Sequence, residues 1–355
     1  MSPSSATTLL AFRRTCYPLR VADLPLEGLR SILGQSFAVE LLLRAVANGR
    51  VASAYLFEGP DGVGKERTAR ALAQATVCRE PLPDHDACGK CVTCRQVAAR
   101  THVDIITLAR EIDVLSQGEH RASDLKTEIV VEKVRLLQAE RLAFQSHQGT
   151  RWVIVRNADE MNTQASNALL KTLEEPPSQT HFALITSRPT QLLTTIRSRC
   201  QRVRFAPLDE ATVRDLLVRG GTAEETATEA ARLADGSMTK ALEFAEPEIL
   251  GSRKEWVDRI LAALRSGRAG AYVDIAEGLK DLGKSDAREV DAVLAMLERH
   301  FRDEALKYAA DQGRRAATCA ARADLVRQTV ESFDRNLNLQ MAVEAMMAGL
   351  REVRA

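Results

Sequence analysis

A glycine-rich segment between positions 59 and 66 has the residue types of a phosphate-binding loop (P-loop). It runs Gly59-Pro60-Asp61-Gly62-Val63-Gly64-Lys65-Glu66 and lies between an apolar run and a helical pattern at 67–77. Gly59, Gly62 and Gly64 would let backbone N–H groups turn toward phosphate oxygens, and the helix start would add positive potential. Lys65 would reach the terminal phosphates. The segment predicts a P-loop fold, with ATP or ADP as candidate ligand.

The residue after the lysine departs from this motif. A Ser or Thr hydroxyl normally holds Mg²⁺ there, whereas this chain has Glu66, whose carboxylate would repel phosphates. Thr68 lies two residues further on, about 200° around a helix, and is poorly placed to substitute. We therefore expect impaired Mg·ATP chemistry and leave nucleotide binding open.

Four of the seven cysteines lie within seventeen positions, at Cys78, Cys88, Cys91 and Cys94. This clustering favours a metal site over a disulfide framework. The spacing C-x9-C-x2-C-x2-C can supply four thiolates to one tetrahedral Zn²⁺, leaving no open position, so the predicted zinc is structural. His85 is a less favoured substitute for Cys78. The alternative is a set of reduced, metal-free thiols.

Short apolar runs alternate with helical patterns through the first 205 residues. This alternation predicts an α/β P-loop domain with a doubly wound parallel sheet. The five expected strands are 54–57, 104–108, 152–155, 182–186 and 202–205.

The strand pattern ends after Pro207, and helical patterns follow to the end of the chain. Gly220-Gly221 and Asp235-Gly236 break the first of them, and two apolar stripes indicate helices packed against a core. The stripes are Val290, Val293, Leu294, Leu297, Phe301 and Leu325, Val326, Val330, Phe333, Leu337. The predicted parts are a flexible arm (1–24), the P-loop domain (25–207) with the cysteine insert (78–94), a small helical lid (208–246) and an all-α domain (247–355). A polar stretch at 116–128 is expected to form a surface loop.

The composition of the chain argues against several classes of function and location. The 355 residues carry a net charge of +1, and aromatic residues make up 4%. A free-standing electrostatic DNA binder needs concentrated positive charge, and aromatic stacking platforms for single strands are disfavoured. No apolar run is long enough to span a membrane, and the start lacks the pattern of a signal peptide. With the cysteine usage, this favours a cytoplasmic location.

Several motifs together resemble the bacterial clamp-loader AAA+ family. The most specific is the run at 167–177, Asn-Ala-Leu-Leu-Lys-Thr-Leu-Glu-Glu-Pro-Pro, and Ser198-Arg199-Cys200 follows it. The four-cysteine insert after the P-loop helix, Gly34-Gln35 near the start, and Asn336-Leu337-Asn338 in the C-terminal region also resemble family motifs. The resemblance implies an AAA+ domain, a lid and a C-terminal collar that joins subunits.

The resemblance also places the ATPase positions. The Walker B aspartate and glutamate would fall at Arg156 and Asn157, eleven and ten residues before Asn167. Asp159-Glu160 comes three residues too late and is expected to begin the next helix. Sensor 1 would lie at Thr186-Ser187, which is compatible with the family. Thr239 stands where sensor 2 supplies an arginine, with Lys240 beside it as an uncertain stand-in. Missing these parts together should nearly abolish hydrolysis.

Arg199 matches the arginine that, in this family, projects into the ATP site of the adjacent subunit. Such an arginine finger contributes roughly 10³–10⁵ in rate. The alternative is an ordinary surface or interface arginine. Cys200 is expected to be a packed small residue, because no histidine is evident nearby to activate it.

The resemblance implies a non-hydrolysing subunit in a hetero-pentamer with gamma/tau-type ATPase subunits and a delta subunit, within the DNA polymerase III holoenzyme. That complex would load the sliding clamp onto primer–template DNA. Two alternatives stay open. The chain could be an ATP-hydrolysing motor subunit, or another AAA+ ATPase of DNA repair, that uses Thr68 and Asp159. It could also be a zinc-knuckle adaptor that binds nucleic acid directly.

Overall fold

The computed structural model describes residues 24–118, 128–147, 149–285, 287–310, 313–333 and 339–353. The chain divides into two compact units, Met1–Ala241 and Leu242–Ala355. Of the predicted arm only residue 24 is described, and of the predicted loop only 116–118 and 128. The predicted collar motif at 336–338 lies outside the described residues.

The first unit is built on a five-stranded sheet in the order β2-β3-β4-β1-β5, with every neighbouring pair parallel. The strands are β1 (Ala54–Glu58), β2 (Ile105–Leu108), β3 (Arg151–Val155), β4 (Thr180–Thr186) and β5 (Gln201–Arg204). All five predicted strands are therefore confirmed, with shifts of one or two residues at their ends.

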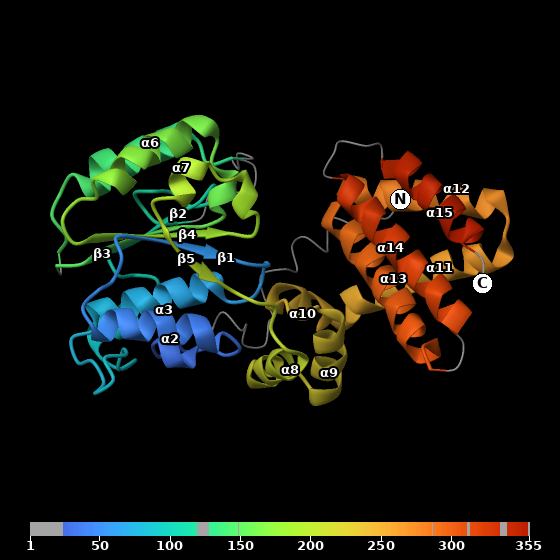
Figure 1. The fold of residues 1–355 in the computed structure, drawn as a ribbon, viewed down its shortest axis with the longest axis horizontal. Helices are drawn as coiled ribbons and strands as arrows, with labels where there is room; N and C mark the ends of the chain where they lie inside the picture. The colour runs from blue at the N-terminus through green and yellow to red at the C-terminus, as the bar shows by residue number, and fades with distance from the viewer. Residues whose placement is uncertain are drawn as a thin grey trace, which may run out of the picture. The chain divides into compact units, whose positions relative to one another are not determined.

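Helices cover both faces of the sheet, and Figure 1 shows α2 and α3 on one face and α6 and α7 on the other. Side chains alternate between the faces as a strand requires. Tyr55 and Phe57 of β1 face the core beneath α2 and α3, whereas Leu56 faces the core beneath α6. The covering helices are α2 (Ser36–Ala47), α3 (Lys65–Val77), α4 (Val92–Ala98), α5 (Val131–Leu136), the π-helix η4 (Leu137–Leu142), α6 (Thr163–Glu174) and α7 (Thr194–Arg197).

Three short helices follow β5, namely α8 (Glu210–Arg219), α9 (Glu224–Leu233) and α10 (Met238–Phe244). The first two end at the predicted breaks: α8 stops before Gly220-Gly221, and α9 stops before Asp235-Gly236. Both Gly221 and Gly236 have positive φ, which favours glycine at such turns. The division between the two units falls within α10, after Ala241.

Asp159 and Glu160 do not begin the next helix, so that prediction was wrong. They lie in a separate single turn of 3-10 helix, η5 (Ala158–Glu160), entered through Asn157 in the left-handed conformation (φ 43°). Helix α6 starts only at Thr163, because Asn162 caps it by accepting a hydrogen bond from the Ala165 N–H.

The second unit is helical throughout its described residues. Its helices are α11 (Pro247–Ser266), α12 (Ala269–Ser285), α13 (Ala287–Tyr308), α14 (Gly313–Phe333) and α15 (Leu339–Glu352). The first predicted stripe is fully buried on α13, from Val290 to Phe301. In the second stripe Val326 is buried and Leu325 and Val330 are half-buried, whereas Leu337 and the side chain of Phe333 are outside the described set. Among the described helices, none combines the length and apolarity that crossing a bilayer requires.

Candidate functional site

The P-loop lies between β1 and α3, as its sequence context predicts. Gly59, Gly62 and Gly64 all have positive φ, and Gly64 is the N-cap of α3. A Cβ at Gly59 would lie 2.4 Å from the carbonyl oxygen of Phe205, and one at Gly62 would lie 2.3 Å from Ser237 Oγ. Glycine is therefore required both by the backbone conformation and by close neighbours.

Lys65 is turned back onto its own loop. Its Nζ donates hydrogen bonds to the carbonyl oxygens of Gly59 (2.6 Å) and Pro60 (2.5 Å) and lies 3.5 Å from a carboxylate oxygen of Asp61. The side chain is only 5% exposed, and this burial lowers the pKa of Lys65, an effect that nearby Asp61 partly opposes. The ammonium group is thus bonded within the loop, and it would have to reorient to meet a phosphate.

Glu66 is the centre of an arginine cluster. Its carboxylate lies 3.1 Å from Arg70 Nε, 3.6 Å from Arg100 Nη2 and 3.1 Å from Arg156 Nε. Burial of the Glu66 carboxyl would raise its pKa, but the charges of Arg156, Arg70 and Arg100 outweigh this and hold the pKa below its usual value. Arg156 also pairs with Glu111, 3.0 Å from its Nη1. Glu66 and Arg156 are the positions at which the family resemblance places two magnesium ligands.

Thr68 and Asp159 are the Mg²⁺ ligands that an ATP-hydrolysing motor subunit would require, and both bind other groups of the chain. Thr68 is fully buried, and its hydroxyl donates to the Gly64 carbonyl oxygen at 2.9 Å. Asp159 accepts a hydrogen bond from the Thr186 hydroxyl at 2.6 Å and one from Arg188 Nε at 2.9 Å. Thr186, the expected sensor 1, lies at the end of β4 as predicted, but its hydroxyl contacts this carboxylate.

The start of α10 packs against the P-loop. Met238 N–H donates to the Gly62 carbonyl oxygen at 2.9 Å. Thr239, at the expected sensor 2 position, lies so close that a Cβ on Gly62 would be 2.7 Å from its backbone nitrogen. The chain therefore brings Thr239 to the loop, where a threonine hydroxyl cannot supply an arginine's charge. Lys240 is exposed.

The four predicted cysteines meet at one point. Their sulfur atoms all lie within 4.8 Å of one another, with 3.6 Å between Cys78 and Cys88 and 3.9 Å between Cys88 and Cys94. A Zn²⁺ about 2.3 Å from four tetrahedral sulfurs would set them about 3.8 Å apart. None of the four is in a disulfide. The geometry fits a zinc ion held by these cysteines, and within the described residues this group forms without His85.

Backbone N–H groups point at the sulfurs, as the knuckle spacing predicts. Cys91 N–H donates to Cys88 Sγ at 3.3 Å, and Cys94 N–H donates to Cys91 Sγ at 3.4 Å. Burial would raise the pKa of the Cys91 thiol, but the backbone N–H groups of Cys94 and Arg79 and the neighbouring thiols of Cys94 and Cys88 lower it to about 6. Burial raises the pKa of Cys94 and Cys78. A bound cation would favour the thiolate form of all four.

Two buried polar side chains, Asp86 and Gln74, link the cysteine cluster and α3 to the segment at 26–30. Asp86 accepts hydrogen bonds from Leu29 N–H (2.8 Å) and Arg30 N–H (2.9 Å). Gln74 of α3 accepts from Gly28 N–H and donates to the carbonyl oxygens of Leu26 and Cys94. These hydrogen bonds tie the segment at 26–30 both to α3 and to the loop that carries the cysteines.

Arg199 lies just beyond α7 and is 37% exposed. Its Nη2 lies 2.6 Å from a carboxylate oxygen of Glu174, the last residue of α6, and its Nη1 donates to the Thr195 carbonyl oxygen at 3.0 Å. Cys200 is buried, and burial raises the pKa of its thiol to about 12, which agrees with a packing role.

Sequence reasoning missed several partners of these residues. Glu58, at the end of β1, is buried and binds both Arg202 and Arg204 of β5. The pairings of Asp159 with Arg188 and of Arg199 with Glu174 were also missed. The contact of Glu58 with β5 could have been predicted only from the parallel pairing of β1 with β5, which sets Glu58 opposite Arg204.

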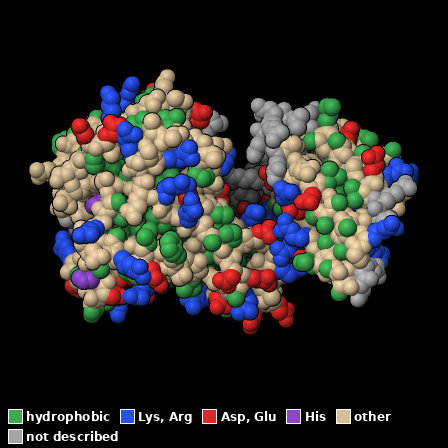
Figure 2. Space-filling view, in the orientation of Figure 1, with side chains coloured by type: hydrophobic (Ala, Val, Ile, Leu, Met, Phe, Trp, Pro, Cys, Tyr) green, Lys and Arg blue, Asp and Glu red, His purple; other side chains and the backbone are tan. Residues whose placement is uncertain are grey.

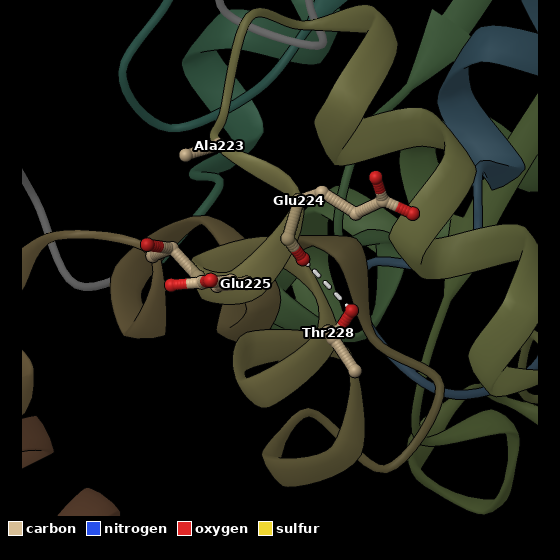
Figure 3. Close-up of a pocket in the computed structure, with 5 residues that line it drawn as sticks. Ala223, Glu224, Glu225 and Thr228 are labelled. Atoms are coloured by element: carbon tan, nitrogen blue, oxygen red, sulfur yellow. Dashed lines mark hydrogen bonds between the residues drawn. The ribbon is translucent and has the colours of Figure 1, made fainter.

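A hollow at the start of α9 is unrelated to these groups. It is lined by Ala223, Glu224, Glu225, Thr226 and Thr228, and Figure 3 shows its two carboxylates. In Figure 2 acidic side chains gather over α8 and α9. Negative charge of this kind disfavours phosphate ligands, so the hollow is not a nucleotide site.

Comparison with known proteins agrees with these features. A family model described as "DNA polymerase III, delta subunit" matches residues 34–209. The chain is 28% identical to the delta-prime subunit of Bacillus subtilis, over 68% of this chain and 69% of that subunit. It is 34% identical to the Escherichia coli delta-prime subunit, over 64% and 65%.

The tau subunit of Escherichia coli is 33% identical, over 61% of this chain and 32% of tau. The chain thus matches just under two thirds of the Escherichia coli delta-prime subunit and about a third of tau. The family-model match, the delta-prime relatives and the motifs at 167–177 and 198–200 identify this chain as a delta-prime-type member of the AAA+ clamp-loader family of DNA polymerase III.

Proposed function

We propose that this clamp-loader subunit does not hydrolyse ATP itself and supplies Arg199 to the ATP site of a neighbouring subunit. Its partners would be gamma/tau-type and delta subunits in a hetero-pentamer that loads the sliding clamp onto primer–template DNA. The similarity to both delta-prime and tau proteins supports membership of that complex.

The observation that carries the non-hydrolysing assignment is the ion pair between Glu66 and Arg156, 3.1 Å apart. In a hydrolysing site these two positions hold one Mg²⁺ between a hydroxyl and a carboxylate. Here a carboxylate and a guanidinium neutralise each other at the same place. A magnesium ion brought there would face the positive charges of Arg156, Arg70 and Arg100, which already surround Glu66.

Three further contacts support the same assignment. Lys65 is bonded to its own loop, Asp159 is held by Thr186 and Arg188, and Thr239 replaces the charge-stabilising arginine. If a nucleotide binds, Lys65 and the N–H groups at the start of α3 would contact its phosphates. Mg·ATP would then lack both a metal ligand and a group to activate water. Thr68 is fully buried, and Asp159 is already held by Thr186 and Arg188, so neither is placed to take those roles.

Zn²⁺ held by Cys78, Cys88, Cys91 and Cys94 would be structural, because four protein thiolates leave no coordination position for a substrate. Its proposed role is to stabilise the segment at 26–30 against α3, through Asp86 and Gln74. This role requires no direct contact of the zinc module with nucleic acid.

Two measurements test the proposal. The purified chain alone should show no Mg²⁺-dependent ATP turnover above a blank, and clear turnover would refute the non-hydrolysing assignment. In the reconstituted complex, Arg199→Ala should lower DNA-stimulated ATPase activity at least ~10-fold while assembly persists. Arg214→Ala, which removes a half-exposed arginine of α8, is the matched control and should change little. Unchanged activity in the Arg199 variant would refute the finger role.

A further inference from the structure

The ion pair between Arg199 and Glu174 suggests a function for the acidic residue. Glu174 is the last residue of α6, and Arg199 follows α7, so the contact joins the ends of two helices that cover the same face of the sheet (Figure 1). Both side chains are partly exposed, at 37% for Arg199 and 47% for Glu174. The pair can therefore open without disturbing the core.

The two contacts of Arg199 hold both terminal nitrogens of its guanidinium on its own subunit. Nη2 lies 2.6 Å from Glu174, and Nη1 donates to Thr195. A carboxylate at the C-terminal end of a helix is disfavoured by the helix dipole, and a guanidinium beside it relieves that repulsion. Glu174 thus gains from the contact as well, which favours the held position of Arg199 in the isolated subunit.

A triphosphate on a neighbouring subunit would compete with Glu174 for the same guanidinium. Phosphate oxygens carry more charge than one carboxylate and bind Arg in a bidentate manner. An exposed ion pair of this kind biases a side chain by roughly fivefold at most. A bound nucleotide can therefore displace Glu174 from the guanidinium. Glu174 nevertheless lowers the fraction of time that Arg199 spends in the neighbouring ATP site.

We propose that Glu174 is a holding residue, which keeps Arg199 on its own subunit until the nucleotide next door displaces it. The inference rests on the proposed role of Arg199 as an arginine finger. Glu174 itself touches no substrate and acts only through Arg199. Its effect is to lower ATP turnover by the neighbour when the nucleotide there is weakly engaged, and so to couple Arg199 release to nucleotide binding.

The test is the DNA-stimulated ATPase of the reconstituted complex carrying Glu174→Gln. This change keeps the side-chain shape and removes the competing charge, so kcat/KM should rise about two- to fivefold. Glu175→Gln is the matched control, because Glu175 is the next residue, is exposed, and makes no ion pair among the described side chains. The difference between wild type and Glu174→Gln should shrink at high salt, which screens the pair. A fall in kcat/KM, or no change, would overturn the inference.

The double variant Arg199→Ala/Glu174→Gln separates this inference from the proposed function. If Glu174 acts through Arg199, the double variant should match Arg199→Ala alone, because residues in one interaction are not additive. If Arg199→Ala leaves the ATPase unchanged, the finger role itself fails. If Arg199→Ala lowers the ATPase and Glu174→Gln has no effect, only the holding role fails.

Discussion

The ion pair between Glu66 and Arg156 should stabilise the first unit, since it links the start of α3 to the end of β3. The two side chains are 24% and 28% exposed, so water screens them less than a surface pair. At an effective dielectric of about 20, charges 3.1 Å apart attract by roughly 5 kcal/mol, and desolvation offsets most of this. We expect a coupling free energy of about 1–2 kcal/mol between the two residues.

Glu66→Gln alone should cost about 2 kcal/mol, because it leaves Arg70, Arg100 and Arg156 without their shared carboxylate. With a urea m-value of about 3 kcal/mol/M, the unfolding midpoint would fall by about 0.7 M. The coupling is obtained from Glu66→Gln, Arg156→Met and the double variant.

Urea unfolding followed by tryptophan fluorescence can report on the first unit alone. The chain has two tryptophans, Trp152 in β3 and Trp256 in the second unit. In a Trp256→Phe background the signal comes only from Trp152, which is fully buried.

The pair Glu40 and Arg44 is a matched control, because its atoms are also 3.1 Å apart but its side chains are 65% and 77% exposed. Its coupling should be only a few tenths of a kcal/mol. A coupling between Glu66 and Arg156 no larger than that of the control would refute the reasoning.

Three further predictions concern other parts of the first unit. The purified chain should bind about one Zn²⁺ ion, and Cys94→Ser should abolish binding and lower the thermal midpoint, as measured by metal analysis and calorimetry. Burial lowers the pKa of His181, so its contribution to stability is present above its unfolded pKa of about 6.5 and is lost as pH falls through the folded pKa. His181→Gln should therefore flatten the fall in stability as pH drops below about 6.5. Gly62→Ala should cost about 2–3 kcal/mol in urea unfolding, because its Cβ would meet Ser237 and Thr239.

Two of these predictions have a matched control. Cys319→Ser removes a buried cysteine outside the cluster and should leave zinc binding intact. Gly49 shares a positive φ, but a Cβ added there would meet no other atom within 4 Å. Gly49→Ala should thus cost only the backbone strain, and an equal cost at Gly62 would argue against the close contact.

The sequence was sufficient to predict the α/β class, the five strands and the helical second unit. These features depend on local patterns, namely continuous apolar runs for buried parallel strands and one-sided stripes for helices. The stripe on α13 is buried from Val290 to Phe301, as predicted. The prediction that the next helix begins at Asp159-Glu160 was wrong. Acidic residues near a helix start are favourable at several positions, and only the left-handed Asn157 and the cap at Asn162 fix where α6 begins.

The candidate site was predicted less completely. The cysteine cluster is local in sequence, and its spacing sufficed to bring four sulfurs together. The pairings of Glu58 with Arg202, Asp159 with Arg188 and Arg199 with Glu174 join segments 25 to 144 residues apart. Charge alone cannot select such partners from 49 basic and 48 acidic residues.

Glu66 and Arg156 show what this difference means for function. Glu66 stands where a P-loop motif has a Ser or Thr hydroxyl, and Arg156 stands where the family has a Walker B carboxylate. Each replacement alone removes a magnesium ligand. Their contact at 3.1 Å shows that the two losses compensate each other, since either charge alone would be partly buried at this place with less to balance it. Replacing both should therefore cost less than the sum of the two single replacements. Recovery of Mg²⁺ binding would require Glu66→Thr and Arg156→Asp together, because either change alone leaves an arginine or a glutamate at the metal position.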